Sequence, residues 1–342
     1  MRIRFVVPFS RATANLIPVV VLTLTCAAQS IPVEYLFMPH RWDGAHGVVF
    51  FGKGLARKEN RPIRAYIDGS PRGAPIDIFK DFPNLQKAVV DDFAAAPDGR
   101  TLVAVVLIFG ARLRHVILTY DASGKLVSVL DTEPYYFQAI ATDDNGNVFA
   151  LGNKLNEGNE RVEPYPLLVV YDATGHVVGA GLSSSVFKNA SRAVNQNEDG
   201  VDPSLMVKDG KLFIYAPEEN EILVCLPDGT VIRRRRMDDV LLKIQRTEGM
   251  TRVRPESVAF VDDNHVMVDV IGHSGPQKAR EFDLARMHPA AYLLNLTTGK
   301  HKVILRGQMV GWNFLGVKGN QLLMLSAVGG QNSTMSHDFS ED

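Results

Sequence analysis

The chain has 342 residues, of which 46% are hydrophobic and 22% charged, and its formal net charge is −1. This is the composition of an ordinary globular protein with enough apolar material for a large core. A net charge near zero argues against a general nucleic-acid binder, which carries a basic excess toward phosphate, and it gives no support to an acidic disordered chain.

The N-terminal segment, residues 1–28, has the layout of a secretory signal peptide. Three arginines within the first eleven residues precede an apolar run, Leu16–Ala28, that ends in small residues. The run is shorter than the roughly 20 apolar residues of a membrane span, so no span is expected after cleavage behind Ala28. We therefore predict an exported protein, periplasmic or extracellular. A lipoprotein anchored through Cys26 is the alternative, although "TLT" before this cysteine lacks the leucine usual three places earlier.

Cleavage there would leave Cys225 as the remaining cysteine, so the mature chain could form no intramolecular disulfide. Cys225 lies in the apolar stretch "EILVCLPDG" and is predicted to be a buried small hydrophobic residue rather than a reactive thiol.

One phrase recurs along the chain: an apolar run, a turn containing glycine, and a second apolar run. It reads "YDASGKLV" at residues 120–127 and "YDATGHVV" at 171–178, and weaker copies follow at 222–232 and 292–304. Each copy is predicted to be a β-hairpin whose turn glycine supplies a positive φ.

A second phrase precedes these hairpins and consists of a short strand, a turn rich in Asp, Gly and Asn, and another strand. Its copies lie at 93–105, 139–151, 204–215, 257–270 and 314–325. Four antiparallel strands in about 50 residues form one propeller blade, and blades stack around an axis because a single blade cannot bury both of its faces.

We therefore predict an all-β fold, a β-propeller over residues 31–328 with six four-stranded blades, closed by pairing of N- and C-terminal strands. The polar residues 329–342 are expected to form a C-terminal tail. Helical periodicity is confined to 237–249 and 279–288, both of which lie between blades.

Polar residues recur where the inner strand of each predicted blade begins, at the mouth of the central channel. Carboxylate and amide oxygens there are hard ligands suited to Ca²⁺ or another divalent cation. The alternative is structural, because an aspartate before an inner strand can bond the neighbouring backbone and join one blade to the next. The nearby carboxylates Asp91 and Asp143 are expected to be turn or surface residues. Aligning the blades on their second strands gives the channel-mouth set Asp92, Gln138, Asp202, Glu256 and Trp312, with Asp92, Asp202 and Glu256 as candidate metal ligands.

The phrases "PDGRTLV", "DDNGNVFAL" and "LPDGTVI" resemble those of secreted six-bladed β-propellers of the NHL-repeat and gluconolactonase/strictosidine-synthase-like superfamily. Gluconolactonase-like enzymes place a Glu, two Asn and an Asp around one metal at the channel mouth and hydrolyse lactones there. The resemblance implies Glu256 and Asp202 as candidate catalytic residues. This chain lacks the two asparagines of that pattern.

The one dense basic run is Arg233, Arg234, Arg235 and Arg236. On a strand it would form a solvated edge, or it would pair with Asp238 and Asp239. The alternative is a patch that binds an anionic polymer.

Two functions follow from these patterns. The first is an exported, monomeric module that binds a protein, a glycan or a small molecule through the channel mouth and the inter-blade loops, without catalysis and without nucleic acid. The second is a metal-dependent lactonase or esterase centred on Glu256 and Asp202. Motifs for an activated serine nucleophile, a zinc protease, a P-loop or a dinucleotide site are missing from the sequence.

Overall fold

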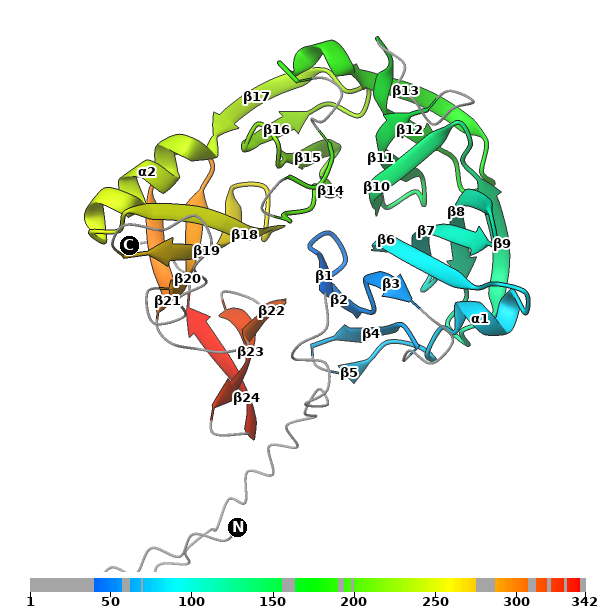
Figure 1. The fold of residues 1–342 in the computed structure, drawn as a ribbon, viewed down its shortest axis with the longest axis horizontal. Helices are drawn as coiled ribbons and strands as arrows, with labels where there is room; N and C mark the ends of the chain where they lie inside the picture. The colour runs from blue at the N-terminus through cyan, green and yellow to red at the C-terminus, as the bar shows by residue number, and fades with distance from the viewer. Residues whose placement is uncertain are drawn as a thin grey trace, which may run out of the picture.

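The computed structural model describes residues 40–56, 62–68, 70–155, 164–189, 194–197, 200–274, 287–306, 312–318, 321–328 and 331–338. The described chain is mostly β-strand, and its sheets follow one another around a central axis (Figure 1). The predicted all-β propeller is therefore confirmed. The predicted signal peptide, residues 1–28, lies outside the described residues.

Six antiparallel sheets make up the described structure, and we number the first five as blades 1 to 5. Blade 1 contains β1 (His40–Asp43), β2 (Val48–Phe51), β4 (Arg64–Ile67) and β5 (Ser70–Pro71). Blade 2 contains β3 (Gly54–Ala56), β6 (Lys87–Ala95), β7 (Thr101–Phe109), β8 (Arg112–Tyr120) and β9 (Leu126–Asp131). Blade 3 contains β10 (Tyr135–Thr142), β11 (Val148–Lys154), β12 (Pro166–Tyr171) and β13 (Val177–Ser183).

Blade 4 contains β14 (Ser204–Lys208), β15 (Lys211–Ala216), β16 (Glu221–Cys225) and β17 (Val231–Arg236). Blade 5 contains β18 (Arg252–Phe260), β19 (His265–His273), β20 (Met287–Asn295) and β21 (His301–Arg306). The last sheet contains β22 (Trp312–Lys318), β23 (Gln321–Val328) and β24 (Gln331–Asp338).

The described residues form five complete blades, and the prediction of six four-stranded blades is not confirmed. The last sheet has three strands among the described residues, and its order is β22-β23-β24. Strand β24 lies in the polar segment 329–342 that was expected to be a tail; a strand of polar residues can still pair through its backbone. The predicted closing strand from the N-terminus falls in residues before His40, outside the described part of the chain.

The repeated phrase at residues 120–127 and 171–178 is the outer hairpin of a blade. It forms β8–β9 in blade 2 and β12–β13 in blade 3. The turn aspartate explains why the wording recurs. Asp121 Oδ1 accepts hydrogen bonds from the backbone N–H groups two and four residues later, at 2.9 and 3.0 Å, and Asp172 does the same at 2.8 and 2.9 Å. Gly124 and Gly175 follow with φ of +75° and +89°, which glycine adopts without strain.

Adjacent blades pack face to face and form the core between them. Phe50 of blade 1 stacks on Phe93 of blade 2 with ring centroids 5.2 Å apart, and Phe213 of blade 4 meets Phe260 of blade 5 at 5.9 Å. Cys225 is fully buried, as predicted, and burial raises the pKa of its thiol to about 12. Central strands are buried on both faces, which is why their sequences are continuous apolar runs rather than alternating ones.

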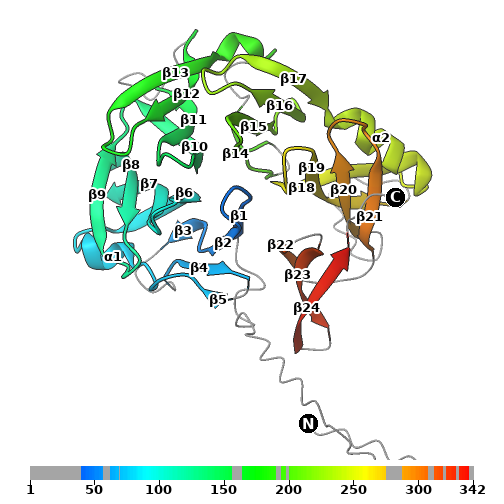
Figure 2. The ribbon, with the colours of Figure 1, turned by 180° about the vertical axis from the view of Figure 1, so that it is seen from behind.

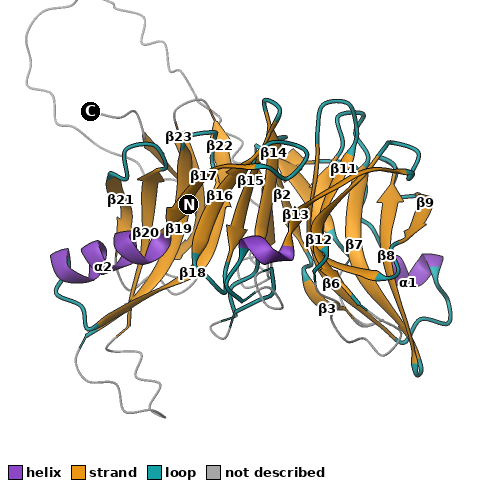
Figure 3. Ribbon diagram, turned by 90° about the horizontal axis from the view of Figure 1, so that it is seen from above, coloured by secondary structure: helices purple, strands orange, loops and turns teal. Residues whose placement is uncertain are grey.

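The helices lie on the rim of the ring, while turns gather on its two faces (Figure 3). α2 (Met237–Thr247) confirms the amphipathic segment predicted between blades, and it buries Met237, Val240 and Ile244 against blades 4 and 5. The short α1 (Ile78–Asp81) was not predicted; Asp77 caps it. Most of the second predicted helix, 279–288, lies outside the described residues. None of the helices in the described ranges has the length and apolar character needed to cross a membrane.

Candidate functional site

The β1–β2 hairpin of blade 1 lies at the centre of the ring, as both face-on views show (Figures 1 and 2). Arg41 Nη2 donates a hydrogen bond to the carbonyl oxygen of Leu205 in blade 4, at 2.7 Å. Trp42 Nε1 donates to the carbonyl oxygen of Phe260 in blade 5, at 3.2 Å. The hairpin therefore crosses the channel and contacts blades that are distant from blade 1 in the sequence.

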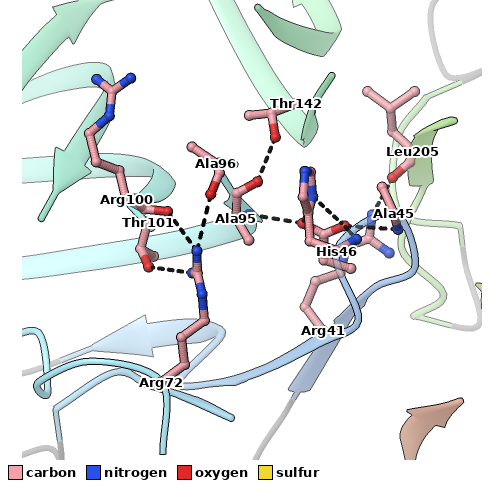
Figure 4. Close-up of polar contacts among 11 residues, drawn as sticks. Arg41, Ala45, His46, Arg72, Ala95, Ala96, Arg100, Thr101, Thr142 and Leu205 are labelled. Atoms are coloured by element: carbon pink, nitrogen blue, oxygen red, sulfur yellow. Dashed lines mark hydrogen bonds and ion pairs between the residues drawn. The ribbon is translucent and has the colours of Figure 1, made fainter. Parts of the chain in front are cut away.

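Asp43 holds the turn of this hairpin and joins it to blade 2. Its partners Ala45, His46 and Ala95 are labelled in Figure 4. Its Oδ2 accepts a hydrogen bond from the backbone N–H of Ala95 at 2.8 Å, and its Oδ1 accepts from the N–H of Ala45 at 3.1 Å. The ring of His46 lies 3.2 Å from Oδ2. Burial alone would raise the pKa of Asp43, but the His46 ring, the Ala95 amide and the charge of Arg41 outweigh it and keep this pKa below its usual value.

Gly44 is required where the hairpin turn meets the far side of the ring. A Cβ atom at this position would lie 2.3 Å from the carbonyl oxygen of Phe260 and 2.9 Å from the sulfur of Met206. The close approach leaves no room for a side chain, so the turn can reach blades 4 and 5 because residue 44 is glycine.

Asp92, the first residue of the predicted channel-mouth set, is fully buried and joins three blades. Its Oδ1 forms an ion pair with Nε of Arg41 at 2.8 Å, and its Oδ2 accepts a hydrogen bond from the N–H of Ile140 in blade 3, also at 2.8 Å. This is the structural alternative described for the channel aspartates. Burial raises the pKa of Asp92 although Arg41 and Lys53 oppose it.

A second set of polar residues, which we call the mouth cluster, lies where the inner strands of blades 2 and 3 begin. Lys53 stands next to β3, whose Gly54 pairs with Val90, and its Nζ forms an ion pair with Asp202 at 2.7 Å. The hydroxyl of Tyr136 donates to Oδ1 of Asp91 at 2.8 Å. The members of the mouth cluster are Lys53, Asp91, Tyr136, Gln138 and Asp202.

Three β-bulges determine which residues face this region. Asp91, Gln138 and Glu256 are each the extra residue where the register shifts between the first two long strands of blades 2, 3 and 5. A bulge redirects a side chain out of the regular alternation of the strand. The expectation that Asp91 is a turn or surface residue is therefore wrong, because the bulge places Asp91 in the mouth cluster while Asp92 points into the core.

The mouth cluster has more hydrogen-bond acceptors than its own donors satisfy. Among the described residues, Oδ2 of Asp91 and Oε1 of Gln138 are buried and accept no hydrogen bond. Burial raises the pKa of Asp91 to about 7, and the nearby charges of Asp202 and Asp92 add to this, while Tyr136 and Lys53 act in the opposite direction. Burial next to Asp91 also raises the pKa of Tyr136.

The two other predicted residues have neighbours outside the mouth cluster. Glu256 forms an ion pair with Arg254 of its own strand at 3.0 Å, and Trp312 begins β22 opposite Ser326. Within the part of the chain that the structure describes, no three His, Cys, Asp or Glu side chains are grouped so that they could hold a metal ion. Asp92, Asp202 and Glu256 thus each pair with a different cation.

The arginine run Arg233–Arg236 joins blades rather than standing apart as a charged patch. Arg234 and Arg236 form ion pairs with the buried Glu221 at 3.1 and 3.4 Å. Arg233 and Arg235 donate hydrogen bonds to Thr297 of blade 5, each at 3.2 Å. Within the described ranges the carboxylate partner of the run is Glu221 rather than the expected Asp238 and Asp239. The run also lies on the expected solvated edge, because Arg233, Arg234 and Arg236 are exposed on β17, an edge strand of blade 4.

Neither a protein family model nor a curated protein matches the sequence. Three solved structures are similar in fold at low identity. A member of the DUF4221 family from Bacteroides vulgatus has a TM-score of 0.48 and 10% identity, with 89% of this chain and 94% of that chain covered. A nidogen/laminin complex has a TM-score of 0.44 and 16% identity, with 84% of this chain and 89% of that chain covered. A protein of unknown function from Bacteroides caccae has a TM-score of 0.41 and 11% identity, with 84% of this chain and 90% of that chain covered. The propeller assignment rests on the order of the sheets and not on these matches.

The contacts of Asp43 predict a large stability loss when its carboxylate is removed. Asp43→Ala leaves the buried N–H of Ala95 without its acceptor, so we expect the free energy of unfolding to fall by about 2–4 kcal/mol. Urea denaturation followed by tryptophan fluorescence measures this change. Asp98→Ala, which removes an exposed aspartate paired with Arg100, is the control and should cost less than about 1 kcal/mol. Equal losses in the two variants would contradict the role given to Asp43.

The raised pKa of Asp91 predicts a pH-dependent stability. In the folded protein the Asp91 carboxyl keeps its proton up to about pH 7, whereas in the unfolded chain it loses the proton near the ordinary pKa of 3.8. Asp91 therefore lowers the free energy of unfolding progressively as the pH rises from 3.8 to about 7. The free energy of unfolding of Asp91→Asn, taken relative to that of the wild type, should therefore rise by about 2–3 kcal/mol from pH 5 to pH 8. Urea denaturation of both proteins at the two pH values tests this, and parallel pH dependences would show that Asp91 titrates normally.

Proposed function

We propose that this chain is a non-catalytic binding module that holds a small polar ligand at the mouth cluster. The supporting observation is the set of buried acceptors there, Oδ2 of Asp91 and Oε1 of Gln138, which accept no hydrogen bond among the described residues. Leaving a buried acceptor unsatisfied costs about 1–3 kcal/mol, and a ligand that supplies donors recovers this free energy.

The position of the cluster fits a binding role. Its residues come from the residue before β3, from β6 and β10, and from the connector before β14, so one ligand there would contact several blades at once. The side chain of Asp202 is 39% exposed and that of its partner Lys53 is 12% exposed, which places the ion pair at the boundary between core and solvent. A rigid ring that presents polar groups from several blades is suited to recognition.

The metal-dependent hydrolase remains a prediction from the sequence resemblance, as does membership of the NHL-repeat and gluconolactonase-like superfamily. Its two proposed residues have separate partners here, Lys53 for Asp202 and Arg254 for Glu256. Export through residues 1–28, with lipidation at Cys26 as the alternative, is likewise a proposal that rests on the sequence of this segment.

A thermal-shift screen on the full chain tests the binding proposal. The probes are monosaccharides, disaccharides, free amino acids and linear diamines, which differ in charge but all carry several hydrogen-bond donors. We expect at least one compound to raise the melting temperature, because a ligand that binds the folded state alone stabilises it. Calorimetric titration should then show at least about tenfold weaker binding of that compound to Gln138→Leu.

Gln245→Leu is the matched control, since Gln245 lies in α2 on the rim of the ring and not at the mouth cluster. It should bind the compound as the wild type does. The proposal fails if no compound in the panel stabilises the wild type, or if every stabilising compound binds Gln138→Leu and the wild type equally.

A further inference from the structure

A hollow lies between blades 3 and 4, at the end of their inner strands opposite to the mouth cluster. Its volume is about 540 Å³. It is lined by the β10–β11 turn, by the β14–β15 turn and by the turn that follows β16, whereas the mouth cluster lies near the start of β10 and β14. We call this hollow the blade 3/4 groove.

The floor of the groove is apolar. Phe149 of β11, Val170 of β12 and Val207 of β14 line it, with exposed fractions of 3%, 8% and 5%. The β10–β11 connection spans 143–147, whereas the β14–β15 turn is the two residues 209–210, so the facing turns differ in length. The outer wall includes Gly179 of β13, where the absence of a side chain leaves space.

The rim of the groove is acidic. Asp143, Asp144, Asp209 and Asp228 line it, together with a single cationic residue, Lys208. Asp143 and Asp228 accept hydrogen bonds from the backbone of their own turns. For Asp144 and Asp209 we find no hydrogen bond or ion pair within the described ranges, so their carboxylates remain available to a ligand.

The shape and charge of the groove define a ligand class. A volume of about 540 Å³ lies in the range of small-molecule sites, which combine an apolar lining with a few polar groups. The four carboxylates do not form a group that could hold a metal ion, a statement that covers the described residues. A molecule with an apolar body and one positively charged nitrogen complements this groove, because the body can cover the apolar floor and the nitrogen can lie near the aspartates of the rim.

We propose that the blade 3/4 groove binds a small amphipathic amine, with its hydrocarbon or aromatic body on Phe149, Val170 and Val207 and its ammonium group near Asp144 and Asp209. This site is separate from the mouth cluster, and the proposal goes beyond the binding function proposed above. No covalent step is involved.

Two compounds of the same shape test the proposal directly. 2-Phenylethylamine carries an ammonium group at neutral pH, and 2-phenylethanol replaces it with a neutral hydroxyl. Calorimetric titration of the full chain should show that the amine binds and that the alcohol binds at least about fivefold more weakly, as expected for ion pairs at a partly exposed rim. Equal affinities, or no binding of either compound, would overturn the proposal.

Three variants locate the site. Asp144→Asn combined with Asp209→Asn should weaken amine binding about fivefold and leave alcohol binding unchanged, and asparagine tolerates the positive φ of residue 209 (+49°). Lys208→Gln removes the competing cation and should strengthen amine binding. Gly179→Leu should block both compounds, because a side chain there fills the groove while its Cβ makes ordinary contacts of 3.7 Å with Val170.

Asp98→Asn, in the corresponding turn of blade 2, is the control and should bind the amine as the wild type does. Circular dichroism and the melting temperature establish that each variant is folded. Amine binding that is unchanged in Gly179→Leu, or reduced equally by Asp98→Asn, would place the amine elsewhere and reject the groove. The Gln138→Leu variant should bind the amine normally, which separates this result from the outcome at the mouth cluster.

Discussion

The contact on which the ring depends is the one between the Asp43 carboxylate and the backbone N–H of Ala95, at 2.8 Å. It ties the β1–β2 hairpin to blade 2, and the same hairpin carries Arg41 and Trp42 to the carbonyl oxygens of blades 4 and 5. Neighbouring blades otherwise meet through apolar faces, which attract without specifying a register. Directional hydrogen bonds at the centre therefore fix the position of the hairpin relative to β6, β14 and β18.

Filling the centre also determines where a ligand can be held. With Arg41, Trp42 and Asp43 crossing the axis, the polar groups near the start of the inner strands are separated from the turns at their other end. One end carries the mouth cluster, where bulges direct Asp91 and Gln138 out of the strand alternation. The other end carries the blade 3/4 groove, where turns of unequal length leave an apolar floor beneath aspartates. The two sites differ in chemistry because hydrogen-bond acceptors dominate the first, whereas a hydrocarbon surface and negative charge dominate the second.

The repeated phrases were sufficient to predict the propeller and the pairing of its strands, because each hairpin is specified locally by its turn aspartate and glycine, as at Asp121 and Gly124. The number of complete blades depended on the ends of the chain, where the repeat is degraded. At the site, the sequence pointed to Asp92, whereas the bulge directs its neighbour Asp91 into the mouth cluster. The adjacent pair at 91–92 was the available signal, since successive side chains of a strand point to opposite faces and both aspartates cannot face the channel mouth. The central hairpin could not be predicted, because its partners Leu205 and Phe260 contribute carbonyl oxygens, which every residue has.

Hydrogen exchange measured by mass spectrometry on Asp43→Asn tests the central role of the hairpin most directly. If the hairpin holds the ring together, backbone amides should exchange faster than in the wild type not only at 40–51 but also around Ala95 in β6, Leu205 in β14 and Phe260 in β18, while the outer strands β12 and β13 remain unchanged. Faster exchange confined to residues 40–51 would contradict this account, because it would show that the blades keep their arrangement without the contacts at the centre.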